Sequence, residues 1–274
     1  VLGALASGVL LYGMSMLYGA TGTLGIEQIA QTIAAGKANQ AVLVFGLVFV
    51  VAGLAFKLGV VPFHMWIPDV YDGAPTPVTG FMATAVKAAG FAALFRVLIQ
   101  AFPGVPAAAV VVAGLALVTM AVGNLVALSQ RSLKRMLAWS SVAHAGYLLV
   151  AAAAGGPSGT AAFLVYIVAY AATTLAAFTI VSWLGRGGEG DVRIDDLAGL
   201  ATRHPWIAFA LAACMLSLLG FPGTVGFIGK WTVLLAAVEA GRWTLAVVLV
   251  VTSVVSAGFY LPVLMVAYMK PPAH

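Results

Sequence analysis

The sequence predicts an all-α protein that crosses a membrane several times. Of its 274 residues, 63% are hydrophobic and only 8% are charged, and the mean hydropathy is +1.09. A water-soluble domain of this size needs many more charged residues on its surface. The apolar residues form long continuous runs, and a helix of about 20 such residues spans a hydrocarbon core about 30 Å thick. Continuous runs favour helices over the alternating strands of a membrane barrel.

Eight apolar runs predict eight crossings. Two of them are about 30 residues long, which exceeds the bilayer unless the helix is tilted or interrupted. Pro62 and Pro68 interrupt the first, and "GFPG" at 220–223 interrupts the second. We expect both helices to be discontinuous, with Pro62 leaving the carbonyl of Leu58 free to attract cavity water. The runs cover residues 1–19, 41–70, 79–100, 106–129, 133–154, 160–184, 204–235 and 243–269.

The two interrupted runs are the second and the seventh, and they cross in opposite directions. This spacing predicts two inverted five-helix repeats, a plan common in transporters. Residues 1–100 then hold the last three helices of one repeat, and residues 101–274 hold the second repeat. Because the chain starts with Val and enters an apolar run at once, we expect it to be a fragment without its N-terminal part. The single cysteine, Cys214, excludes disulfides and cysteine-ligated iron–sulfur clusters within this chain.

The basic residues of the connections are distributed unequally between the two sides. If the chain crosses eight times, seven of these basic residues fall on one side of the membrane, and two, Lys37 and Arg242, fall on the other. Basic residues are retained on the cytoplasmic side of membrane proteins. We therefore expect that side, with the C-terminus, to be cytoplasmic. Its basic residues are Arg131, Lys134, Arg135, Arg186, Arg193, Arg203 and Lys270.

Four basic residues remain inside the spans. Arg96 lies near the end of its span, from which its side chain can reach the interface. Lys57, Lys87 and Lys230 lie deeper, where a charged side chain costs at least about 2.5 to 3.5 kcal/mol and usually serves a function. The alternative is a buried ion pair that fixes helix packing. All eight acidic residues, however, lie in connections or at span ends.

His144, in "WSSVAHAGYLL", adds a fourth titratable group inside a span. Imidazole changes its charge near neutral pH, and burial disfavours the charged form of an amine. A single membrane histidine is also compatible with a simple packing role. Four titratable residues on four different spans predict a proton path across the bundle, formed by Lys57, Lys87, His144 and Lys230.

Three segments resemble the antiporter-like subunits of respiratory complex I. They are "FKLGVVPFHMWIPDVYDGAPTPVTGFMATAVKAAGF" (56–91), "LKRMLAWSSVAHAGY" (133–147) and "LLGFPGTVGFIGKW" (218–231). Within this family, Lys230 resembles the N type of subunit, because the M type typically carries a glutamate at this position. The "ATAVKAAGF" pattern (83–91) also resembles the N type, because the L type lacks it. The fold implied is a transmembrane bundle of inverted five-helix repeats with two discontinuous helices.

The resemblance implies a role for each of the four residues. Lys57 corresponds to the lysine of the broken seventh helix, Lys87 to the connecting lysine of the eighth, His144 to the relay histidine of the tenth and Lys230 to the lysine of the twelfth. The family's fifth-helix glutamate, which pairs with the seventh-helix lysine, has no counterpart in this sequence.

The resemblance also implies a non-redox subunit of a proton-translocating NADH:quinone oxidoreductase in a bacterial inner membrane. No cofactor is expected in this chain. NADH, FMN, iron–sulfur clusters and quinone would bind to partner subunits, whose redox chemistry would drive the protons. The expected partners are the lipid bilayer, a neighbouring antiporter-like subunit and small membrane subunits. Binding to nucleic acid is not expected.

Three other functions compete with this prediction. One is a subunit of a multi-subunit sodium/proton antiporter, because such subunits share this fold. Another is a scaffold that conducts no protons. The last is haem ligation by His64 and His144, which is weaker because His64 lies near a span end.

Overall fold

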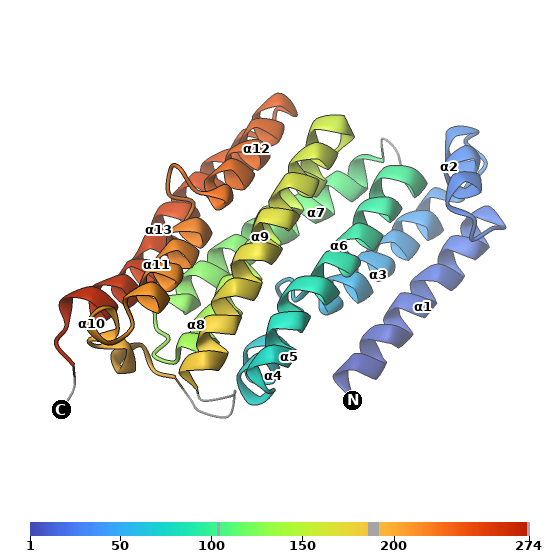
Figure 1. Cartoon of the computed structure of the whole chain (residues 1–274). Coiled ribbons are helices and arrows are strands. Elements are labelled where there is room, and N and C mark those ends of the chain that lie inside the picture. Colours follow the sequence, from blue (N-terminus) through green and yellow to red (C-terminus); the bar gives the residue numbers. More distant parts are fainter. Residues whose placement is uncertain (103–104, 186–191, 273–274) are drawn as a thin grey trace.

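The computed structural model describes residues 1–102, 105–185 and 192–272. Within these ranges the chain forms helices, joined by turns and one isolated bridge between Ser132 and Arg193. The long helices lie roughly parallel and antiparallel to one another in one bundle (Figure 1). The elements are α1 (Leu2–Thr21), α2 (Ile26–Ala34), α3 (Gln40–Leu58), α4 (Trp66–Gly73), α5 (Thr76–Phe81), η1 (Met82–Val86), α6 (Lys87–Arg96), η2 (Val97–Ala101), α7 (Pro106–Ala127), α8 (Leu133–Ala154), α9 (Gly156–Leu184), η3 (Ile194–Leu197), α10 (Leu200–Arg203), α11 (Pro205–Leu219), α12 (Val225–Glu239) and α13 (Trp243–Met269).

The predicted fold class is confirmed. Among the described residues, seven helical segments are long and apolar enough to cross a membrane. The seventh predicted crossing, 204–235, is divided between α11 and α12, which have 15 residues each. The third is continuous but irregular, because η1 and η2 are π-helical turns on either side of α6. The chain is therefore a multi-pass membrane protein. The division into two inverted repeats at residue 100 stays a prediction.

Helix α8 forms the centre of the bundle. Its most apolar 18-residue window is 89% buried, whereas the other six long segments are 17–50% buried. Glycines bring α7 and α8 together: a Cβ on Gly123 would lie 2.6 Å from the backbone nitrogen of Ala143, and one on Gly146 would lie 2.7 Å from that of Met120. Such small residues allow membrane helices to pack backbone to backbone. The polar residues of α8 are thereby held away from lipid.

The first break differs from its prediction. Helix α3 ends at Leu58 because Gly59 adopts a left-handed conformation with φ of 71°, and the N–H of Val60 reaches back to the carbonyl of Ala55. Pro62 lies three residues beyond this cap, so it does not cause the break. The indole of Trp66 donates to the carbonyl of Phe56 at 2.8 Å, so a side chain satisfies one acceptor at the end of α3. The attraction of water to the carbonyl of Leu58 stays a prediction.

The second break has the same construction. Gly220 caps α11 with φ of 85°, and the N–H of Phe221 bonds the carbonyl of Leu216. Helix α12 then begins at the cap residue Thr224, whose side chain accepts from the N–H of Phe227. In both breaks a left-handed glycine ends the first half-helix and a proline follows within three residues. The two breaks are therefore alike in construction, and a repeat relation between them stays a prediction.

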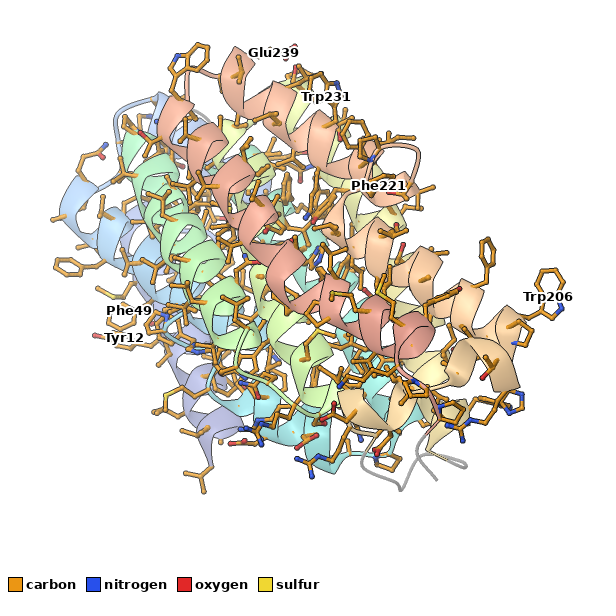
Figure 2. The ribbon with its side chains drawn as sticks, turned by 90° about the vertical axis from the view of Figure 1, so that its left-hand side faces the viewer. Tyr12, Phe49, Trp206, Phe221, Trp231 and Glu239 are labelled. Carbon is orange, nitrogen blue, oxygen red and sulfur yellow. The ribbon has the colours of Figure 1, made fainter. Side chains whose placement is uncertain are left out.

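The basic connections meet at one end of the bundle, where the C-terminus also lies (Figure 1). The N–H of Leu133 bonds the carbonyl of Val192, and the N–H of Gly199 bonds that of Lys270. Arg186 lies outside the described residues. Trp206 projects away from α11 at this end (Figure 2), as an interfacial anchor does.

Candidate functional site

The structure buries three of the four predicted site residues and exposes the fourth. The side chains of Lys87, His144 and Lys230 are 1%, 3% and 6% exposed and lie on α6, α8 and α12. Lys57, at the end of α3, is exposed. Within the described ranges it makes no hydrogen bond or ion pair, so this structure does not join it to the other three.

Lys87 is held by α8. Its amine donates to the carbonyl oxygen of Ser141 at 2.6 Å and to the hydroxyl of the same residue at 2.5 Å. Tyr170 of α9 donates its own hydroxyl to that oxygen at 2.8 Å. Lys87 directly follows the π-helical turn η1, a local widening of the helix that is often found at functional sites. Three helices therefore meet at one serine hydroxyl.

His144 bonds a tyrosine through each ring nitrogen. Nδ1 lies 2.6 Å from the hydroxyl of Tyr166 on α9, and Nε2 lies 3.1 Å from that of Tyr260 on α13. The Tyr260 hydroxyl also bonds that of Ser140, one helical turn before the histidine. Because both ring nitrogens are engaged, neither is free to ligate iron. Haem ligation by His64 and His144 is therefore unsupported, and within the described ranges no group of three or more histidine, cysteine or acidic residues is arranged to hold a metal.

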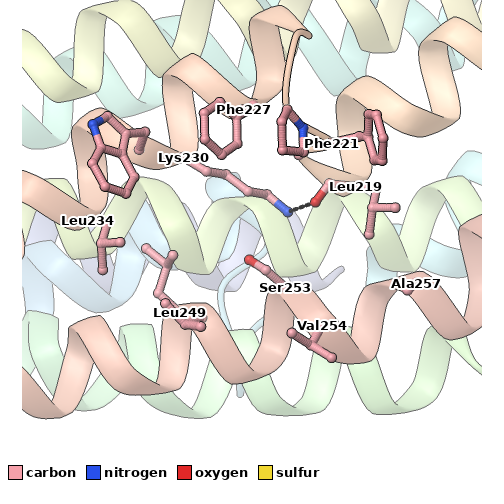
Figure 3. A pocket seen from close by; sticks show the side chains of 13 residues that line it. Leu219, Phe221, Phe227, Lys230, Leu234, Leu249, Ser253, Val254 and Ala257 are labelled. Carbon is pink, nitrogen blue, oxygen red and sulfur yellow. Dashed lines mark hydrogen bonds between the residues drawn. The ribbon is translucent and has the colours of Figure 1, made fainter.

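Lys230 lies against the second break. Its amine donates to the carbonyl of Leu219 at 2.8 Å, an acceptor left free where α11 ends (Figure 3). The same amine lies 4.7 Å from the ring centre of Tyr147, a favourable arrangement for a cation. At this break the free carbonyl accepts directly from an amine, whereas the sequence predicted a free carbonyl only at the first break, as a site for cavity water.

A cavity of about 410 Å³ adjoins Lys230 between the break, α12 and α13. Its walls are mostly apolar, and Ser253 of α13 faces the amine from the opposite side (Figure 3). Gly220 leaves room for the lysine, since a Cβ there would lie 2.8 Å from the Cδ of Lys230. The break therefore supplies both a hydrogen-bond acceptor and space.

No carboxylate accompanies the three buried groups in the described part of the chain. The ion pairs there join Arg135 to Asp69 and Asp72, and Lys270 to Asp195, all at the basic end of the bundle. The buried amines are instead surrounded by carbonyl groups, hydroxyl groups and aromatic faces. Carbonyl and hydroxyl oxygens accept hydrogen bonds from an ammonium, but they carry no negative charge that would hold it in the charged form as a carboxylate does. This surrounding suits groups that change their protonation state.

Sequence reasoning missed three tyrosines of the site. Tyr166 and Tyr170 lie four residues apart on α9, and Thr173 and Thr174 follow three and four residues after Tyr170. This polar stripe on an apolar helix is a signal that the sequence carries. Tyr260, in contrast, has no such local pattern, and only the packing of α13 against α8 brings it to His144.

Comparisons with known proteins agree with this architecture. Residues 1–256 match the model of the family described as NADH:quinone oxidoreductase/Mrp antiporter, transmembrane. The chain is 48% identical over 285 residues to an NADH-quinone oxidoreductase subunit N of Herminiimonas arsenicoxydans, covering 100% of the chain and 57% of that protein. The chain thus spans little more than half the length of this curated relative.

Two solved structures are also similar. In respiratory complex I from Thermus thermophilus, a chain with 40% identity matches with a TM-score of 0.85, over 99% of this chain and 58% of that one. In the Mrp complex from Dietzia sp., a chain with 28% identity matches with a TM-score of 0.89, over 99% and 50%. With its two broken crossings and buried lysines, the chain belongs to the family of NADH:quinone oxidoreductase and Mrp antiporter transmembrane proteins.

Proposed function

We propose that this chain is part of an antiporter-like subunit of the N type, which moves protons through the membrane arm of an NADH:quinone oxidoreductase. The observation that carries the proposal is the burial of Lys87, His144 and Lys230 on three helices without a carboxylate in the described ranges. An intramembrane lysine that serves only packing is normally paired. Amines held by hydroxyls and carbonyls are suited to gain and lose protons.

Lys57 belongs to the same path in this proposal, although it is exposed in the described chain. An exposed lysine at the end of an apolar helix needs cover when the protein is in a membrane. We propose that a carboxylate from outside these 274 residues lies opposite its amine. Charge on Lys57 would then be set by that contact.

The energy for transport must come from other subunits. Moving one proton against 100 mV costs about 2.3 kcal/mol. We propose that quinone reduction in partner subunits, which bind NADH, FMN and iron–sulfur clusters, supplies this energy. A neighbouring antiporter-like subunit and small membrane subunits would contact this chain in the membrane.

The location proposed is the bacterial inner membrane, with the C-terminus in the cytoplasm. Its support is the clustering of Arg131, Lys134, Arg135, Arg193 and Lys270 at one end of the bundle. Basic residues are retained on the cytoplasmic side.

The alternative is a subunit of a multi-subunit sodium/proton antiporter. The structural likeness to the Mrp complex favours it, with a TM-score of 0.89. Sequence identity favours the oxidoreductase, at 48% and 40% against 28%. Sodium-dependent proton transport by the isolated subunits, without NADH or quinone, would favour the antiporter function.

The test replaces Lys57, Lys87 and Lys230 separately by methionine in the assembled complex. Electron transfer and proton uptake are then compared in proteoliposomes. Each variant is expected to lower the number of protons moved per electron, because a methionine cannot accept a proton. Lys37→Met, in an exposed connection, is the matched control. Unchanged pumping in all three variants would favour the scaffold function.

A further inference from the structure

We propose that Tyr166, His144, Tyr260 and Ser140 form one hydrogen-bonded chain that carries the proton between the Lys230 end and the Lys87 end of the site. We call these four residues the hydroxyl chain. The inference rests on the proposed function, and it assigns proton conduction to Tyr166, Tyr260 and Ser140. In the described residues His144 makes no direct hydrogen bond to either lysine, so a proton that passes through it needs intermediate groups.

The bonds of the hydroxyl chain are continuous. Tyr166 bonds Nδ1 of His144 at 2.6 Å, Nε2 bonds Tyr260 at 3.1 Å, and Tyr260 bonds Ser140. All four side chains are buried. A neutral imidazole carries one N–H donor and one acceptor nitrogen, and a tyrosine hydroxyl both donates and accepts. Each bond therefore fixes the direction of the next, so the whole chain has one polarity at a time.

The two terminal residues of the hydroxyl chain lie next to residues that adjoin or bind the two buried lysines. Tyr166 packs against Gly229, the residue before Lys230, where an added Cβ would lie 2.5 Å from the tyrosine ring. At the other end, Ser140 precedes Ser141, which binds the Lys87 amine. A water molecule at each end would complete the connection, as bridging waters do in other polar networks.

The transfer balances without any charged tyrosine. Consider the state in which Tyr166 donates to Nδ1 and the Nε2–H group donates to Tyr260. A proton delivered to the Tyr166 oxygen releases the hydroxyl proton of that residue to Nδ1. His144 then gives its Nε2 proton to Tyr260, which passes its own proton to Ser140, and Ser140 releases a proton on the Lys87 side.

One proton enters and one leaves, and His144 ends in its other tautomer. The chain is then oriented in the opposite sense. Before it can carry a second proton in the same direction, the hydroxyls and the imidazole must return to their first orientation. The hydroxyl chain therefore passes one proton in each orientation cycle.

The test uses the assembled complex in proteoliposomes, with NADH and a short-chain quinone as substrates and a pH-sensitive dye inside. The variants are Tyr260→Phe and Tyr166→Phe, which keep the ring and remove only the O–H group. Tyr268→Phe is the matched control, because Tyr268 is on the same helix but 48% exposed. His144→Gln provides the reference for loss of this path.

We expect Tyr260→Phe and Tyr166→Phe to lower the proton-to-electron ratio as far as His144→Gln does, and Tyr268→Phe to leave it unchanged. If His144→Gln lowers the ratio and both phenylalanine variants match wild type, the hydroxyl chain is refuted while the proposed function stands. If His144→Gln has no effect, the role of His144 in transport and this inference both fail.

A spectroscopic measurement separates conduction from packing. Isotope-edited infrared spectra of labelled histidine report the tautomer of His144 through its ring-stretching band. Tyr260→Phe removes the partner of Nε2, so we expect this band to change, whereas Tyr268→Phe should preserve it. An unchanged band in Tyr260→Phe overturns the inference. If Tyr260→Phe does not assemble, Ser140→Ala removes the last hydroxyl of the chain and is judged by the same ratio.

Discussion

Replacement of Lys87 by methionine distinguishes a lysine that moves protons from one that only holds helices together. The side chain is 1% exposed, and its amine makes two hydrogen bonds to Ser141. Methionine has a similar length and fits the same apolar surroundings, but it carries no charge. The substitution therefore removes the chemistry of Lys87 and keeps most of its packing.

The expected change in stability follows from two opposing contributions. A lysine in the middle of a membrane helix costs about 2.5 to 3.5 kcal/mol, which the substitution removes. Interhelical hydrogen bonds in membrane proteins contribute about 0.6 kcal/mol each, so two lost bonds offset about 1.2 kcal/mol. Lys87→Met should thus increase the free energy of unfolding by roughly 1 to 2 kcal/mol, about 5- to 30-fold in the folding equilibrium.

Two assays measure the opposite effects of this substitution. Reversible unfolding of the full-length subunit in mixed micelles, followed by circular dichroism, gives the free energy of unfolding. Proteoliposomes containing the assembled complex give the proton-to-electron ratio, which should fall. Lys37→Met should change neither quantity, because its side chain is exposed in a connection. A variant that unfolds more easily yet pumps at the wild-type ratio would show that Lys87 serves packing alone.

Three further predictions concern packing and charge. Gly229→Ala should displace Tyr166, 2.5 Å from the new Cβ, and lower proton uptake to the level of Tyr166→Phe; uptake at the wild-type level would contradict this contact. Gly123→Ala should separate α7 from α8 and destabilise the protein by about 1 to 3 kcal/mol, as measured by unfolding in micelles, and a neutral result would mean that the helices adjust freely. The hydrogen bond from Lys270 lowers the pKa of Asp195. This pair should therefore stabilise the C-terminal end at pH values above the ordinary pKa of aspartate, and the stabilisation should be lost as the pH falls through the lowered pKa. The difference in thermal unfolding midpoint between wild type and Asp195→Asn should accordingly vanish in acid, and a difference that persists there would refute the ion pair as its cause.

The breaks show how local signals indicate a feature without fixing its mechanism. Pro62 and Pro68 in the first long run predicted an interruption near Lys57, and one is present. Its position is set by Gly59, however, whose left-handed conformation ends α3 before Pro62 is reached. Proline is easy to recognise as a helix breaker, whereas a glycine inside an apolar run adopts a left-handed cap only where the following residues can pack. Here Ile67 does so, 1.7 Å from where a Cβ on Gly59 would lie.

The amino-acid sequence by itself determined the membrane class, the approximate crossings and the four candidates Lys57, Lys87, His144 and Lys230. These properties are local, because the length of an apolar run and a charge within it can be read without knowing any neighbour. Only the tertiary structure decided which hydroxyls reach which titratable group. Tyr166 and Tyr260 lie 22 and 116 residues from His144 along the chain. They meet it because close packing sets the rotation of each helix about its axis, and that rotation depends on all the helices together.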